Sequence, residues 1–164
     1  MKVNFYLKSL GLILTLIGLN VHAGGGSFQS VLTGNFEWKS LDTVDGSVMS
    51  GAFQGIGMVV EGDGVFKSGM ASRGECLVRV RNHLGGRDIN AECTIDYPEL
   101  DSKMFMLLER KAGDIANAGA KGDGTQTILG GTNKLKGISG TCSYSIKYLD
   151  AVTTVSNNNC NYSM

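Results

Sequence analysis

Two stretches of this chain each place a pair of cysteines where an antiparallel hairpin would bring them face to face. In the first, residues 75–81 and 88–95 flank a turn at 83–86, and a hairpin centred on that turn sets Cys76 opposite Cys93. In this register one face of the pair is apolar and the other is polar. A half-buried antiparallel pair has this pattern, because only one face packs against the core. The sequence therefore predicts a hairpin that carries a Cys76–Cys93 disulfide.

The second stretch predicts a disulfide between Cys142 and Cys160. Alternate residues of 141–148 are apolar or aromatic, and the two cysteines lie at equal distances in sequence from Ala151. The facing residues match less well here, so we expect a bulge or a longer loop near the turn. Four cysteines allow three pairings by count alone, and hairpin geometry favours these two. Each disulfide would close a loop of about 17 residues, which stabilises a fold by roughly 3 kcal/mol.

Other uses of the cysteines fit the sequence poorly. A zinc site would need cysteines two to four residues apart or histidine partners, and a nucleophilic cysteine would need a nearby base. His83 is the only histidine after residue 23, and it falls at the expected hairpin tip. Structural disulfides are therefore favoured over a metal site or a catalytic cysteine.

The first 23 residues predict that the chain is exported. Two lysines and a mainly apolar run at 10–19 precede a small-x-small cleavage site at 21–23. This is the pattern of a secretory signal peptide, here cleaved after Ala23. The apolar run is too short to cross a bilayer, so no stable membrane insertion is expected. Residues 24–164 are then one mature domain, secreted or periplasmic, where disulfides form.

Recurring glycines favour an all-β fold. The chain has 24 glycines and one proline, and glycine pairs or Gly-x-Gly triplets separate short candidate strands. No window after residue 23 has helical periodicity. We expect a single antiparallel β-barrel of about eight strands closed by hairpins, with a sandwich as the alternative. The Gly-Asp-Gly triplets 62–64 and 122–124 are interpreted as turns, since neither has the ligand density of a calcium loop.

The charge balance excludes a nucleic-acid footprint. Without Lys2 and Lys8 the chain has 13 basic and 15 acidic residues, a net charge of about −2. A nucleic-acid-binding domain would be strongly basic, with clustered lysine and arginine. The segment 130–132, Gly-Gly-Thr, lacks the Gly-Lys-Ser/Thr ending and the helix of a phosphate-binding loop, so no cofactor is expected.

Two groups of charged residues are candidates for sites, and both are interpreted as facing solvent. Four acidic residues follow or flank the strand of Cys93; they are Glu92, Asp96, Glu99 and Asp101. Paired carboxylates support acid–base catalysis only when they are held close in a partly dry site. The segment 109–111, Glu-Arg-Lys, is interpreted as a solvated strand end. No catalytic residue is predicted.

Two groups of apolar residues leave alternatives open. One strand is expected to be apolar on both faces; its residues are Met104, Phe105, Met106, Leu107 and Leu108. Its outer face is therefore expected to be covered, by a second copy of the chain or by an N-terminal segment. Four aromatic residues either line an interior cavity or fill the core; they are Trp38, Phe53, Tyr144 and Tyr148.

One segment carries a family resemblance. Residues 128–140, Ile-Leu-Gly-Gly-Thr-Asn-Lys-Leu-Lys-Gly-Ile-Ser-Gly, are similar to the strand–turn–strand signature of allene oxide cyclase-like and dirigent-type barrels. In that signature a strand ends at the double glycine, a tight turn presents a lysine and a buried aliphatic residue, and the next strand starts after the final glycine. Asn133 stands where glycine is commoner, and asparagine also tolerates the left-handed conformation.

The resemblance implies an eight-stranded antiparallel barrel with a central cavity, often oligomeric. Plant members of the family guide cyclisation or coupling of reactive small molecules through the shape of an apolar cavity. Their polar residues have no one-to-one match in this chain, so the resemblance assigns no catalytic residue here. The chain also departs from them in its two expected disulfides and its bacterial-type signal peptide.

The sequence supports three classes of function. The first is a non-catalytic exported protein that holds a small apolar ligand or mediates an interaction. The second is an isomerase or cyclase that works through an apolar cavity. The third is a secreted factor that engages a host or envelope surface through its outer face, with 104–108 as the contact. An interior cavity with a protonatable group would favour the enzyme, and a solidly packed barrel would exclude both small-molecule functions.

Overall fold

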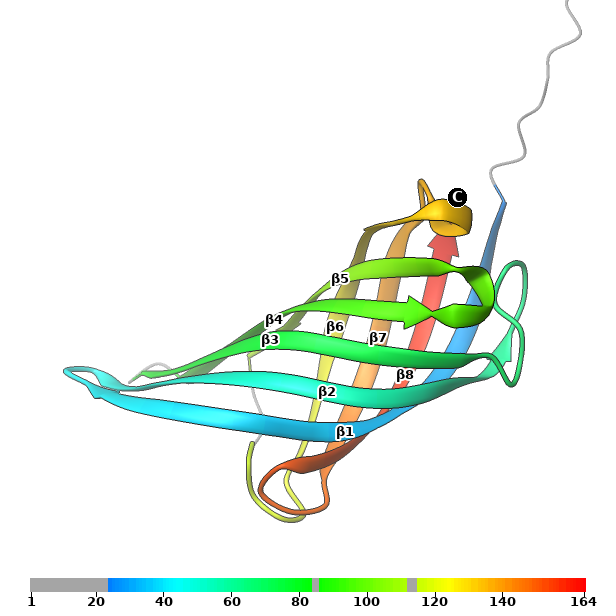
Figure 1. Ribbon diagram of the computed structural model, residues 1–164. Helices are drawn as coiled ribbons and strands as arrows, with labels where there is room; N and C mark the ends of the chain where they lie inside the picture. The colour runs from blue at the N-terminus through cyan, green and yellow to red at the C-terminus, as the bar shows by residue number, and fades with distance from the viewer. Residues whose placement is uncertain (1–23, 84–85, 112–114) are drawn as a thin grey trace, which may run out of the picture.

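The computed structural model describes residues 24–83, 86–111 and 115–164. They form a closed barrel of eight antiparallel strands, in which each strand pairs with the next and β1 pairs with β8 (Figure 1). The predicted fold class is confirmed. The expected signal peptide, 1–23, and two residues of the first hairpin turn, 84–85, lie outside the described residues. The strands are β1 Gly25–Thr43, β2 Gly46–Gly62, β3 Ala71–His83, β4 Gly86–Tyr97, β5 Ser102–Arg110, β6 Lys121–Gly131, β7 Ser139–Tyr148 and β8 Thr153–Ser163.

Alternation of side chains decides which face of each strand is buried. Along β3, Val78 and Val80 are buried inside the barrel, whereas Arg79 and Arg81 between and beyond them are exposed. The same period of two holds along β7, where Cys142 and Tyr144 are buried and Ser143 is exposed. Because closed strands present one apolar face to a common axis, these inward residues form the core.

Both expected disulfides are present. In the β3–β4 hairpin, Cys76 pairs with Cys93 in the predicted register, and their sulfur atoms are bonded. In the β7–β8 hairpin, Cys142 is bonded to Cys160. Each disulfide thus joins neighbouring strands across the interior side of the sheet, where three of the four cysteines are buried.

The β7–β8 hairpin turns through a loop at 149–152. Pairing of the two strands continues in one register up to this loop, so the longer loop is present in place of the bulge. The Asp150 carboxylate accepts hydrogen bonds from the backbone N–H groups of Thr153, at 2.7 Å, and Val152, at 2.8 Å. These bonds hold the pKa of the Asp150 carboxyl below its ordinary value. The loop is therefore closed by its own side chain.

A row of glycines crosses three neighbouring strands. Gly34 of β1 lies beside Gly55 of β2, which lies beside Gly74 of β3. A side chain at Gly34 or Gly55 would meet the backbone of the facing strand and the ring of Phe53. Phe53 instead fills the space that the glycines leave, which lets the sheet bend closely at this point.

One end of the barrel is closed by aromatic side chains. Phe66, between β2 and β3, is fully buried. Its ring centroid lies 4.2 Å from that of Phe28 and 5.1 Å from those of Tyr97 and Tyr162. The Tyr162 hydroxyl donates a hydrogen bond of 2.9 Å to the Asp63 carbonyl, which ties the loop to β8. Aromatic side chains therefore pack closely at this end.

The two Gly-Asp-Gly triplets have different structures. The first, 62–64, ends β2 and turns as predicted, with Gly64 at a φ of 63°. The prediction of a turn at 122–124 is wrong, because these residues lie inside β6 and pair with β7. Here Gly122 and Gly124 are not turn residues but the small residues of a strand whose neighbours need space.

The turn between β6 and β7 matches most of its expected geometry. β6 ends at Gly131, Asn133 has a φ of 48° in the left-handed region, and Leu135 is fully buried. A short 3₁₀ helix, η2 Asn133–Leu135, forms the turn. β7 begins at Ser139, before Gly140 rather than after it, so the expected strand start is wrong by that residue.

Candidate functional site

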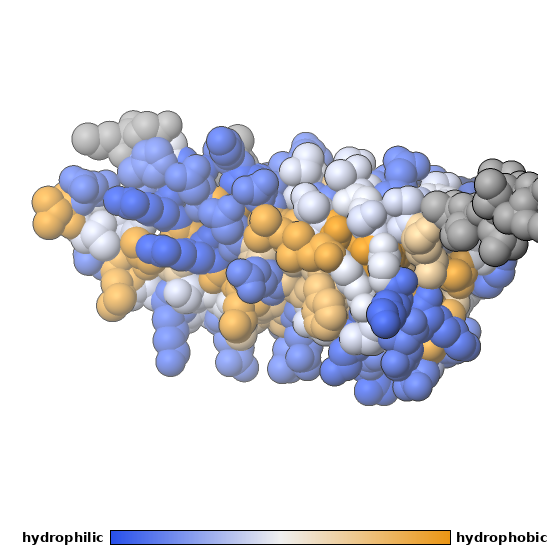
Figure 2. Space-filling model, turned by 90° about the horizontal axis from the view of Figure 1, so that it is seen from above, coloured by the Kyte–Doolittle hydropathy of each residue, from blue (hydrophilic) through white to orange (hydrophobic). Residues whose placement is uncertain are grey.

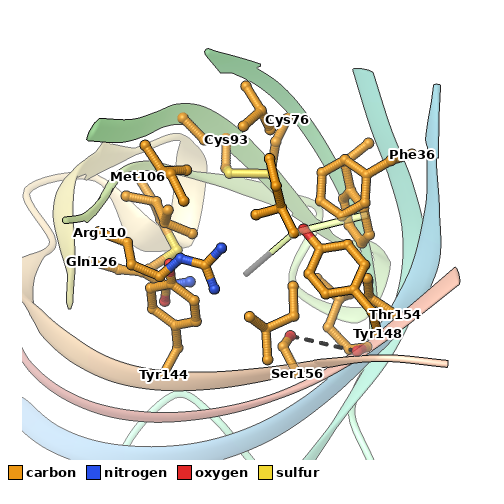
Figure 3. A pocket seen from close by; sticks show the side chains of 18 of the residues that line it. Phe36, Cys76, Cys93, Met106, Arg110, Gln126, Tyr144, Tyr148, Thr154 and Ser156 are labelled. Atoms are coloured by element: carbon orange, nitrogen blue, oxygen red, sulfur yellow. Dashed lines mark hydrogen bonds between the residues drawn. A yellow bond between two sulfur atoms is a disulfide. The ribbon is translucent and has the colours of Figure 1, made fainter. Parts of the chain in front are cut away.

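The barrel encloses an interior cavity of about 70 Å³. Its wall is mostly aromatic and aliphatic, and the Cys76–Cys93 disulfide forms part of it (Figure 3). The apolar lining includes Phe36, Val78, Ile89, Ala91, Met106 and Ile115. A barrel of eight strands can be filled or can hold one small ligand, and this one is hollow on the side away from the aromatic end.

The four aromatic residues singled out in the sequence line this one cavity. Trp38 and Phe53 come from β1 and β2, and Tyr144 and Tyr148 come from β7. They also pack as core: the Phe36 ring stacks on Trp38 with centroids 4.7 Å apart. The two alternatives for these residues are thus both realised, because the core of the barrel is also the wall of its cavity.

Arg110 brings a positive charge into the cavity. It is the last residue of β5, and only 5% of its surface is exposed. Figure 3 shows its guanidinium projecting into the cavity near the rings of Tyr144 and Tyr148. The interpretation of 109–111 as a solvated strand end is wrong for Arg110, because this residue has the inward orientation of Met106, four positions earlier in the strand.

Two glycines of β6 create the space for these polar side chains. A side chain at Gly122 would collide with the guanidinium of Arg110, and one at Gly124 would collide with the ring of Tyr144. These two glycines of β6 therefore leave room inside the barrel for the side chain of Arg110 on β5 and for that of Tyr144 on β7.

Burial keeps the two cavity phenols protonated. Loss of hydration raises the pKa of Tyr144 to about 12, although the charge of Arg110 acts against this rise. Burial also raises the pKa of Tyr148, again opposed by Arg110, which makes a side-chain hydrogen bond with it. Near neutral pH both phenols are neutral hydrogen-bonding groups beside a cation.

This burial predicts a loss of stability at high pH. The folded protein holds the Tyr144 proton up to about pH 12, whereas an unfolded tyrosine ionises near pH 10. Stability from this group is therefore complete below pH 10 and is lost as the pH rises to 12, by about 3 kcal/mol. Urea unfolding of the wild type and of Tyr144→Phe across this range measures the effect. Equal pH dependence in the two proteins would contradict the assigned cause.

A smaller cavity lies nearer the aromatic end and shares Leu32, Ile95, Met106 and Gln126 with the larger one. The Gln126 amide nitrogen donates a hydrogen bond of 3.2 Å to the Asn158 side-chain oxygen. Gln126 lines both cavities, and the second has a volume of about 30 Å³. Asn158 in turn donates to the Ser30 carbonyl at 3.4 Å. Gln126 is thus a polar member of the wall shared by the two cavities, and Asn158 holds it from the side of the smaller one.

The acidic residues near Cys93 do not form a site. Glu92 is exposed, and Asp96 lies in register between Arg73 of β3 and Lys103 of β5 on the outer face. The Glu99 carboxylate accepts a hydrogen bond of 3.0 Å from the first backbone N–H of β3. Within the described ranges, no group of three or more metal-ligating side chains comes together.

The apolar stretch 104–108 faces both the core and the outside. Met104 and Met106 are buried, whereas Phe105 is 39% exposed on the outer face. Phe105 lines an open groove of about 480 Å³ together with Leu77 of β3 and Leu129 of β6, which are also exposed. Figure 2 shows hydrophobic side chains gathered across the middle of the upper side of the barrel, between hydrophilic ones.

In the part of the chain that the structure describes, no helix has the length and apolar character needed to cross a membrane. Comparison with known proteins finds no matching family model, no matching curated protein and no matching solved structure.

Proposed function

We propose that this protein is an exported, disulfide-bonded barrel that binds a small, mainly apolar molecule in its interior cavity. The carrying observation is the cavity of about 70 Å³ beside Arg110, whose wall is formed mainly by aromatic and aliphatic side chains. Ligand sites in proteins are typically apolar cavities with a few convergent polar groups. The polar groups here are Arg110, Gln126, Tyr144 and Tyr148.

Binding is favoured over the alternative of an isomerase or cyclase. The cavity does contain protonatable groups, which would support catalysis. However, proton transfer near neutral pH is efficient when the group's pKa is close to the operating pH. The pKa of Tyr144 is raised to about 12, and that of Tyr148 is also raised. These phenols are suited to donate hydrogen bonds to a bound molecule rather than to exchange protons with it.

Export is part of the same proposal. Its support is the signal-peptide pattern of residues 1–23 together with the two disulfides, which persist in oxidising compartments. We also propose a relationship to the allene oxide cyclase-like barrels, for which the support is the sequence of residues 128–140.

The apolar outer groove supports a second candidate, a homo-oligomer. Phe105, Leu77 and Leu129 are exposed large hydrophobic residues on one open surface. Charged residues of both signs flank them, Glu75 and Glu92 on one side and Lys103 beside Phe105 on the strand. Such a surface can match a second copy of itself, and a subunit count greater than one would support it.

Native mass spectrometry of protein purified from an exporting host tests these proposals together. We expect a mass that exceeds the chain mass and returns to it on denaturation, because the ligand is held without a covalent bond. The Ala91→Leu variant fills the cavity wall and is expected to lose this extra mass, since Ala91 lines the cavity and is buried. The matched control is Ala52→Leu on the outer groove, which should retain it.

The same experiment can reject the proposal. A bare mass for the wild type, together with no rise in melting temperature on addition of 1-hexanol, would contradict ligand binding in the cavity. Equal ligand loss in Ala91→Leu and Ala52→Leu would place the ligand elsewhere.

A further inference from the structure

We propose that the interior cavity binds a small carbonyl compound of low polarity, such as a ketone or an ester, whose oxygen accepts a hydrogen bond from the indole N–H of Trp38. This inference rests on the proposed function and adds the chemical class of the ligand to it.

The indole nitrogen of Trp38 is a buried donor without an acceptor. Trp38 lines the cavity, and its Nε1 atom is buried with no hydrogen-bond partner within the described ranges of the chain. An indole N–H can only donate, so a group that accepts is needed to satisfy it. Because buried polar groups in proteins are almost always hydrogen-bonded, this N–H indicates an acceptor that the protein does not supply.

Two neighbours fix the orientation of this indole. The Phe36 ring stacks on it, with centroids 4.7 Å apart and an interplanar angle of 14°. The benzo edge of the indole lies over Gly51 of β2, where a Cβ atom would come within 2.5 Å of Cζ3 and 2.6 Å of Cε3. Nε1 is on the opposite edge of the ring system, so its N–H is turned away from Gly51. A donor held in this way is preorganised, and the protein loses little further freedom when a ligand meets it.

Several other polar side chains of the cavity wall already donate within the protein. The hydroxyls of Thr154 and Ser156 donate to backbone carbonyl groups of β1, each at 3.5 Å. The amide nitrogen of Gln126 donates to Asn158 at 3.2 Å. Trp38 differs from these residues, since its acceptor has to come from the bound molecule.

A carbonyl compound suits both this donor and its surroundings. Its oxygen accepts hydrogen bonds, and it brings no donor that would itself need a partner. The apolar wall, which includes Phe36, Val78 and Ile89, favours hydrocarbon for the rest of the molecule. A cavity of about 70 Å³ offers about five water-sized positions, which suits a single small ring or a short chain. An alkane would leave the Trp38 N–H unpaired, and an ammonium compound would bring further donors but no acceptor.

Cyclopentanone and methylenecyclopentane test the proposal, because they share one ring and differ only in a C=O group against a C=CH₂ group. Trp38 is the only tryptophan of the chain, so the mature protein gives a single indole N–H signal in a proton–nitrogen correlation NMR spectrum. We expect saturating cyclopentanone to move this proton signal downfield, because a hydrogen bond forms. Methylenecyclopentane occupies the same space without an acceptor and should cause a clearly smaller change.

Variants assign the hydrogen bond to the indole. Trp38→Phe removes the donor and keeps an aromatic ring. It is expected to lower the affinity for cyclopentanone, relative to that for methylenecyclopentane, about tenfold in isothermal titration calorimetry. Taking the ratio of the two affinities cancels the different hydration of the probes and the space that the smaller ring leaves. The matched control Phe53→Leu alters another aromatic residue of the wall without removing a donor, and it should leave the ratio unchanged.

Binding of cyclopentanone that moves the indole signal no further downfield than methylenecyclopentane does would overturn the carbonyl inference and leave the apolar binding function standing. A fall of the affinity ratio in Tyr144→Phe but not in Trp38→Phe would overturn the role of Trp38 and assign the bond to the phenol. Failure of both probes to bind the wild type would overturn both the inference and the proposed function. If Trp38→Phe does not fold, the NMR comparison of the two probes on the wild type decides the outcome.

Discussion

Replacing all four cysteines by alanine is expected to lower the free energy of unfolding by about 6 kcal/mol, because each closed loop contributes about 3 kcal/mol through the chain entropy of the unfolded state. The loops span 17 residues for Cys76–Cys93 and 18 residues for Cys142–Cys160. Single domains are stable by only about 5–15 kcal/mol, so the variant is expected to be close to unfolding at room temperature. Urea unfolding followed by circular dichroism measures the loss.

The two disulfides can be tested separately. The double variants Cys76→Ala/Cys93→Ala and Cys142→Ala/Cys160→Ala should lose similar amounts, since the loops are nearly equal in length. A loss below about 1 kcal/mol in either double variant would contradict the loop-closure argument for that pair. Reduction of the wild type with a thiol provides an independent measurement without any change of sequence.

Phe66→Ala is expected to cost about 3–5 kcal/mol, because it leaves a cavity at the packed end of the barrel. Phe66 is fully buried and contacts the rings of Phe28, Tyr97 and Tyr162. Phe28, Tyr97 and Tyr162 belong to β1, β4 and β8. Removal of the Phe66 ring therefore weakens the contacts between strands that close this end of the barrel. Thermal and urea unfolding measure the change.

The matched control for this variant is Phe105→Ala on the outer face. Phe105 is 39% exposed, so its removal should cost much less than that of Phe66. Phe66 does not line the larger cavity. Phe66→Ala should therefore retain the molecule bound in the larger cavity whenever it folds. A cost of less than about 1 kcal/mol for Phe66→Ala would show that the aromatic cluster repacks around the missing ring.

The hairpins could be predicted from the sequence because their pairing is local. Cys76 and Cys93 are separated by a short turn, and the period of two along each strand sets which residues share a face. A register shifted by one residue would place the apolar face in solvent. The alternation of side chains around the cysteines therefore predicts both the register and the disulfide pairing from the sequence alone.

Arg110 could have been placed by the same parity. Met104 and Met106 are buried, and residue 110 continues their inward series along β5. The charged triplet 109–111 obscured this, since arginine is usually exposed. The compensating signal was Gly122, which leaves the space for the guanidinium. Gly122 is distant from Arg110 in sequence, and it lies in a Gly-Asp-Gly triplet that is typical of a turn. Only the closed barrel places this glycine beside the guanidinium.

The sequence by itself determined the β class, the hairpin registers and the two disulfides, because each depends on the alternation of side chains over a few residues. Tertiary structure decided which glycines turn the chain and which make room for a neighbour, since this depends on the facing strand. It also decided that aromatic side chains close one end of the barrel and that the larger cavity lies toward the other. The cavity with its buried arginine arises only when all eight strands close around one axis, because its wall is assembled from residues that lie far apart in the sequence.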